Sequence, residues 1–90
     1  MGYEYELDFG LVDRGQADVI LRGIVGFVAH DRDLELYSFR RAATGVMPDA
    51  HAKIEPSGVY VCINGGSHEI LRDIQSAFAA VGLRAEPREL

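Results

Sequence analysis

The 90-residue chain has a single cysteine, Cys62, no tryptophan and three prolines, and no apolar run approaches the roughly 18 residues of a membrane span. One cysteine cannot form an internal disulfide, so a reducing compartment, the cytoplasm, is expected. The opening residues, Met-Gly-Tyr-Glu-Tyr-Glu, lack the basic start and apolar stretch of a secretory signal. These absences predict a soluble protein that is neither exported nor membrane-bound.

Positive charge is also scarce, because 9 Arg and Lys residues stand against 14 Asp and Glu and give a formal net charge of −5. The basic residues are scattered, and only Arg40 and Arg41 are adjacent. This balance opposes approach to a phosphate backbone, so nucleic acid is not an expected partner. The hydrophobic fraction of 48% is ordinary for a globular chain, and residues 1–90 are predicted to form one α+β domain.

The first half of the chain shows a strand pattern, a helix pattern and a second strand pattern. Residues 3–9 alternate between an apolar side and an acidic side, the latter consisting of Glu4, Glu6 and Asp8. Asp13 and Gln16 form a capping-box pattern that predicts a helix from about Asp13 to Val25, with Phe27 to Ala29 as either its frayed last turn or a short strand. After the polar turn at 30–33, residues 34–41 predict another strand.

The second half predicts a hairpin, a helix and an edge strand. Residues 50–55 and 59–64 are expected to pair antiparallel around Glu55-Pro56-Ser57-Gly58, with Gly58 providing a positive φ. An apolar stripe over residues 70–81 predicts the clearest helix, ended by Gly82 and Leu83 as a Schellman motif. The last eight residues, 83–90, are charged and contain Pro87, which favours an edge strand.

This order of elements resembles the ferredoxin-like split βαβ plan, in which two helices cover one face of a mainly antiparallel sheet. The fold class expected is therefore α+β with four or five strands and room for an extra hairpin. In that plan the last strand lies beside the first, so Arg84 and Arg88 come within reach of its acidic side. The stretch MPDAHAKIEPSGVYVCINGG, residues 47–66, is also similar to small uncharacterised bacterial proteins, a resemblance that implies no activity.

The strongest ligand-site pattern is the turn before the last helix, made of Asn64, Gly65, Gly66, Ser67 and His68. Free N–H groups and the positive end of the helix dipole predict an anion site there, with His68 as a further donor. The alternative is purely structural: the glycines turn the chain and Ser67 caps the helix. Because a Walker lysine and a GxGxxG spacing are both missing and Glu69 adds negative charge, the structural interpretation is favoured.

The other chemistry-bearing residues predict neither a cofactor nor a metal, and they leave any catalytic residues unidentified. Cys62, His30, His51 and His68 do not occur as closely spaced ligand pairs, and Cys62 is expected to be a small packed thiol beside Tyr60 and Asn64. The stretches 30–33 and 49–51 combine His with Asp but are interpreted as solvated loops.

These patterns favour a non-enzymatic binding or regulatory protein. Aromatic residues that are left on the open face of the sheet would form a partner surface, as would the loop of residues 42–49, and a homodimer is one expected outcome. Two alternatives remain open. One is the anionic-ligand site at residues 64–68, sensory or enzymatic. The other is an immunity-type inhibitor that blocks a basic protein with Glu4, Glu6 and Asp8.

Overall fold

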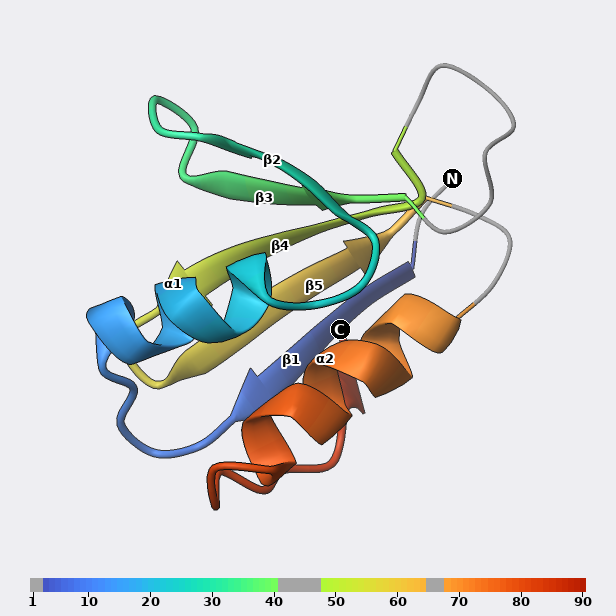
Figure 1. Ribbon diagram of the computed structural model, residues 1–90. Coiled ribbons are helices and arrows are strands. Elements are labelled where there is room, and N and C mark those ends of the chain that lie inside the picture. The colour runs from blue at the N-terminus through green and yellow to red at the C-terminus, as the bar shows by residue number, and fades with distance from the viewer. Residues whose placement is uncertain (1–2, 41–47, 65–67) are drawn as a thin grey trace.

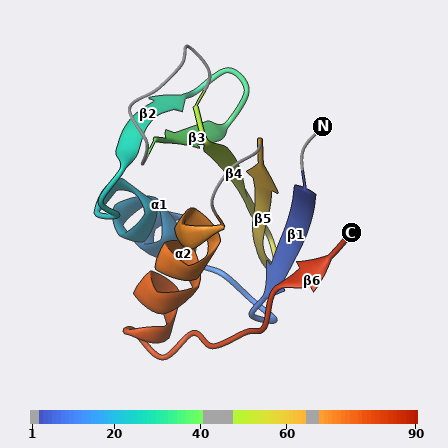
Figure 2. The same ribbon diagram turned by 90° about the vertical axis from the view of Figure 1, so that its right-hand side faces the viewer.

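The computed structural model of the chain describes residues 3–40, 48–64 and 68–90. Within these ranges two helices pack on one side of a six-stranded antiparallel sheet of order β2-β3-β4-β5-β1-β6 (Figure 1). The α+β class is confirmed, whereas the expected count of four or five strands is too low. Figure 2 shows both helices on the same side of the sheet, with the β2–β3 hairpin at one end and β6 at the other.

The first strand and helix follow their sequence patterns closely. Strand β1 (Tyr3–Asp8) leads into α1 (Arg14–Arg22), and the Asp13 carboxylate accepts from the Gln16 N–H at 3.0 Å, as the capping box predicts. The helix ends three residues earlier than expected. Its last turn tightens, since the Ile24 N–H bonds to the Leu21 carbonyl three residues back, and Gly26 then has a φ of +103°, which is outside the helical range. The chain then turns into β2.

The additional strand is formed by the segment that begins at Phe27, for which the sequence left both a frayed helix turn and a short strand open. Residues after α1 form β2 (Phe27–Asp31), which pairs antiparallel with β3 (Leu36–Phe39) and contains an irregularity between Phe27 and Ala29. His30 and Asp31 thus belong to a strand, and β3 is shorter than the predicted 34–41. The Asp31 carboxylate closes the intervening turn by accepting from the N–H groups of Asp33 and Leu34.

The predicted hairpin forms between β4 (Ala50–Glu55) and β5 (Gly58–Ile63). The expected reason for Gly58 is wrong, because its φ is not positive. Instead, β1 passes so close that a Cβ on Gly58 would lie 1.8 Å from the Leu7 carbonyl oxygen. Gly58 is therefore required by close backbone packing between β5 and β1.

The last helix, α2 (Glu69–Ala79), ends in the predicted Schellman motif. The Leu83 N–H bonds to the Phe78 carbonyl, the Gly82 N–H bonds to the Ala79 carbonyl, and Gly82 has a φ of +88°. The final strand β6 (Arg88–Glu89) is much shorter than the expected 83–90. Upstream of it, Pro87 has no N–H to donate, and the Ala85 carbonyl accepts from the Gln75 side chain instead of pairing with a strand.

The core lies between the helices and the sheet. Its largest fully buried side chains come from both layers: Leu7, Leu21, Phe39, Val59, Val61, Ile63, Ile70, Ile74 and Phe78. Burying each such side chain is worth roughly 1.5–3 kcal/mol, more than the approximately 1 kcal/mol of a helix cap. Packing against the sheet therefore dominates the stability of both helices.

Candidate functional site

The side of the sheet away from the helices presents one side chain in two from every strand. On β1 these are Glu4, Glu6 and Asp8, which pair across the register with Cys62, Tyr60 and Gly58 of β5. The row continues onto β4, where His51, Lys53 and Glu55 lie opposite the same three residues of β5. In the described part of the chain neither helix lies on this side (Figure 2), and we call it the open face.

The open face is polar rather than aromatic. Tyr37 and Phe39 are buried on the helix side, Phe9 stacks on Phe78 of α2, and Tyr3 and Tyr5 contact His68 at the start of α2. Of the six aromatic residues that the strand patterns contain, Tyr60 is the one on the open face, and the other five are Tyr3, Tyr5, Phe9, Tyr37 and Phe39. The alternation of β1 explains this outcome, because the helices cover its aromatic side and leave its acidic side uncovered.

Carboxylates outnumber cations on the part of the open face formed by β4, β5, β1 and β6. Four carboxylates, Glu4, Glu6, Asp8 and Glu55, face two cations, Lys53 and Arg88. Arg88 bonds to Glu6 with an Nη2–Oε1 distance of 2.8 Å, which confirms that the last strand reaches the acidic side of the first. Because the Arg88 side chain is 69% exposed, this pair adds little stability.

Two hydrogen bonds position other carboxylates of this row. The Tyr60 hydroxyl donates to Glu4, and this bond, with partial burial, raises the pKa of Tyr60 above its ordinary value of 10.0. The Asp8 carboxylate accepts from the Gly10 N–H at 2.8 Å. Each bond uses one oxygen of its carboxylate and fixes the position of that carboxylate on the open face.

A chain of hydrogen bonds joins Cys62, Asn64 and His51 at one end of the same face. The Cys62 thiol donates to Asn64 Oδ1 at 3.6 Å, and Asn64 Nδ2 donates to the Pro48 carbonyl and to His51 Nδ1, each at 3.0 Å. Cys62 lies beside Tyr60 and Asn64, as expected, and directly opposite His51. Asn64 thus fastens the ends of β4 and β5 together.

The predicted anion site divides into described and undescribed parts. Gly65, Gly66 and Ser67 lie outside the described residues, as does most of the 42–49 loop. The side-chain amide of Asn64 donates to two acceptors within the protein, the Pro48 carbonyl and His51 Nδ1. His68 precedes α2 without a side-chain cap bond, and its ring lies 5.3 Å from that of Tyr3 and 5.7 Å from that of Tyr5. Asn64 and His68 thus both make contacts within the protein, and the anion site at residues 64–68 stays a prediction.

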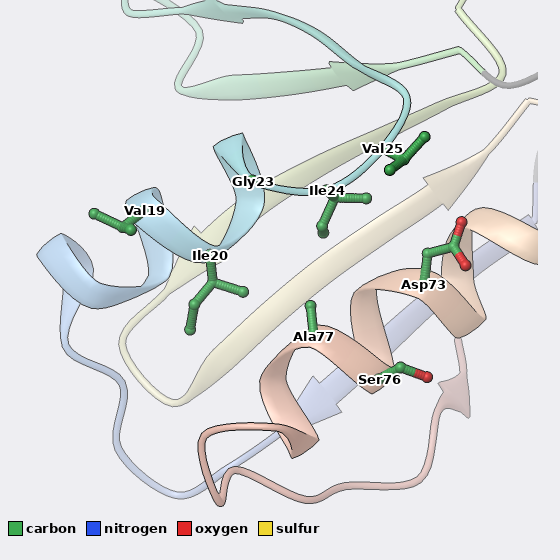
Figure 3. Close-up of a pocket in the computed structure, with 8 residues that line it drawn as sticks. All are labelled: Val19, Ile20, Gly23, Ile24, Val25, Asp73, Ser76 and Ala77. Atoms are coloured by element: carbon green, nitrogen blue, oxygen red, sulfur yellow. The ribbon is translucent and has the colours of Figure 1, made fainter.

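An apolar groove between the helices is a feature that the sequence did not predict. Figure 3 shows the residues that line it, on α1, on the segment that follows α1, and on α2. The volume of the groove is about 640 Å³. Its wall is aliphatic apart from Asp73 and Ser76 on α2, and Val19 and Val25 at its rim are 70% and 85% exposed. The sequence signal that could have indicated this groove is the pair Val19 and Val25, two apolar residues that lie outside the buried stripe of α1.

Comparisons of the chain with protein-family models, with curated proteins and with solved structures find no match. Within residues 3–40, 48–64 and 68–90, no three His, Cys, Asp or Glu side chains gather as a metal site would require. The helices in those ranges are too short or too polar to cross a membrane.

Proposed function

We propose that this chain is a non-enzymatic binding protein whose open face meets a basic surface on a partner protein. The observation that carries the proposal is the acidic row Glu4, Glu6 and Asp8, extended by Glu55, on a sheet side that the helices leave uncovered. A basic partner fits because opposite charges steer encounter and fix orientation. An immunity-type inhibitor that covers the basic active surface of another protein is the specific form we favour.

The composition of the face supports a basic partner over self-association. A second copy placed on this face would bring like carboxylates together, which disfavours a symmetric contact. With Tyr60 as its single strand aromatic, the face also offers little apolar area to a like surface. The overall charge of −5 adds a long-range attraction to basic proteins.

We further infer a ferredoxin-like plan with an inserted hairpin. Strands β4, β5, β1 and β6 are adjacent in that order, with α1 preceding β4 and α2 connecting β5 to β6. The β2–β3 pair then extends the β4 edge. This likeness is one of topology and supports no function by itself, so the proposal depends on the residues of the open face.

The test compares two double variants that remove the same charge. Glu4→Gln with Asp8→Asn neutralises the open face while retaining acceptors for Tyr60 and Gly10. Asp33→Asn with Glu86→Gln neutralises two exposed carboxylates elsewhere. Tagged forms of the wild type and both double variants are exposed to extract of the source cells at about 50 mM and about 300 mM salt, and captured proteins are quantified.

We expect the wild type and the control variant to capture the same basic protein, and the open-face variant to retain much less of it. Capture should weaken at the higher salt, because exposed charges are then screened. Equal capture by both double variants would contradict the proposal. Light scattering at high protein concentration provides a second check, since a stable dimer that the open-face substitutions dissociate would assign the face to self-association.

A further inference from the structure

A polar pocket, distinct from the apolar groove between the helices, lies on the opposite side of the sheet from the acidic row. The start of α1, the β2–β3 turn and the end of β4 enclose a volume of about 190 Å³. That is roughly the space of six water molecules, which suits a ligand of a few heavy atoms. Six residues from these elements line it: Arg14, His30, Arg32, Glu35, Tyr37 and Ile54.

A closed network holds one wall of this pocket. Arg22 Nε donates to both oxygens of Asp18 at 3.0 Å, and Arg22 Nη2 lies 2.9 Å from His30 Nδ1. The His30 ring stacks on Tyr37 with centroids 4.1 Å apart and planes at 12°. Because the Tyr37 hydroxyl donates to Asp18, the network joins α1 to both strands of the β2–β3 hairpin. The wall is therefore formed before any ligand arrives.

The network also determines which ring nitrogen of His30 can donate. A guanidinium has no acceptor, so Arg22 must donate to His30 Nδ1, and the proton of the neutral ring is then on Nε2. The bonds described for His30 use Nδ1, so the Nε2–H is available to a ligand. The Asp18 carboxylate beside it is already occupied by Tyr37 and Arg22.

Two guanidinium groups add further donors. Among the described residues, Arg14 makes two long polar contacts, 3.5 Å to the Ile54 carbonyl and 3.8 Å to Glu35, and its side chain is 60% exposed. Arg32 is exposed in the turn, where the neighbouring Asp31 carboxylate is engaged by backbone N–H groups. Of the lining residues one is a carboxylate, Glu35, and it competes with any anion for Arg14.

We propose that this pocket binds a small oxyanion, a carboxylate or phosphate group, between Arg14 and Arg32 with the His30 Nε2–H as a third donor. The planar guanidinium forks match the oxygen spacing of either group. Binding displaces Glu35 from Arg14. This site is separate from the open face and does not depend on the function proposed for it.

The experiment is a titration of the folded protein with inorganic phosphate and with acetate, at constant ionic strength set by chloride. Chemical shifts of backbone amides and arginine side chains are followed by NMR. The variants are Arg32→Gln, Glu35→Gln and the control Arg72→Gln, which removes the same charge as Arg32→Gln from an exposed position on α2. Arg14→Gln serves as a second pocket variant if Arg32→Gln does not fold.

For the wild type we expect saturable shifts at Arg14, His30 and residues 32–37 with at least one anion, and a dissociation constant on the order of 1 mM. Loss of either pocket arginine should weaken binding about tenfold. Glu35→Gln should strengthen it severalfold, because it removes both competition and repulsion. Arg72→Gln should change affinity less than about twofold.

Three results would overturn the proposal. Shifts that fail to saturate by about 50 mM with either anion would mean that no site exists. Equal weakening by Arg72→Gln and Arg32→Gln would assign the effect to net charge. Weaker binding in Glu35→Gln would mean that Glu35 does not compete with the ligand. A response to phosphate but not acetate, or the reverse, identifies the favoured oxyanion.

Discussion

The Tyr37 hydroxyl donates a hydrogen bond of 2.5 Å to Oδ1 of Asp18 and so joins β3 to α1 across 19 positions of the chain. Tyr37 is 3% exposed: its ring stacks on that of His30, and its hydroxyl reaches the Asp18 carboxylate. Bonds to a charged acceptor are worth more than neutral ones, although the Asp18 side chain is 35% exposed, which lowers the gain.

Tyr37→Phe is expected to destabilise the protein by about 1–2 kcal/mol, because it deletes this bond and leaves the ring in place. Urea unfolding measures the change. A double-mutant cycle with Asp18→Asn should give a coupling energy of about 1 kcal/mol. Tyr3→Phe, at a 52% exposed ring, is the control and should lie within about 0.5 kcal/mol of the wild type. Equal effects of the two Phe substitutions would mean that the bond contributes nothing.

Lowering the pH should remove the contribution that the ionised Asp18 carboxylate makes to the free energy of unfolding. Hydrogen bonding from Tyr37, with help from Arg22, lowers the pKa of Asp18 from 3.8, so the folded state favours the ionised carboxylate. The stability gained is present above pH 3.8 and is lost as the pH falls through the lower folded value. The free energies of unfolding of wild type and Asp18→Asn should differ at pH 7, and the difference should shrink as the pH falls below 3.8. A constant difference would contradict the assignment.

Raising the pH should remove the contribution that the Tyr37 hydroxyl makes to the free energy of unfolding. Burial, followed by the bond to Asp18, raises the pKa of Tyr37 from 10.0 to about 12, so the folded state favours the protonated phenol. That stability is present below pH 10.0 and disappears as the pH rises through about 12. Since Tyr60 and Tyr5 also have raised pKa values, the measured quantity is the difference between wild type and Tyr37→Phe, which should shrink across this range.

Gly58→Ala is expected to cost at least about 3 kcal/mol, because the new methyl group would overlap the Leu7 carbonyl and force β5 away from β1. Thermal or urea unfolding checks the effect. The control is Gly23→Ala, whose methyl would lie 3.4 Å from the nearest carbonyl oxygen and should change stability by less than about 1 kcal/mol. Similar costs at both positions would refute the close approach of the strands.

Asn64→Asp is expected to destabilise the protein by about 2 kcal/mol. The substitution keeps the shape but replaces the donor to the Pro48 carbonyl with an acceptor. Cys62→Ser, which retains a donor to the Asn64 side chain, should cost less than about 1 kcal/mol. An Asn64→Asp variant as stable as the wild type would mean that the bond to the Pro48 carbonyl contributes little.

Much of the local structure was predictable because its signals act within a few residues. The Asp13 cap, the Gly82 Schellman motif and the turn at Pro56-Ser57 all depend on near neighbours in the chain. The two-residue turn even specifies the register, since it pairs Glu55 with Gly58 and consequently His51 with Cys62. That pairing could have been inferred from the sequence.

The amino-acid sequence by itself determined which residues face water along β1, β5 and α2, because side-chain periodicity is a local property. The tertiary structure alone decided that β2 pairs with β3 at the sheet edge, and that His30, interpreted as part of a solvated loop, stacks on Tyr37 beside two arginines. It also decided that Gly58 lies against β1. Each of these contacts joins distant parts of the chain, and its free energy depends on long-range packing that no short pattern records.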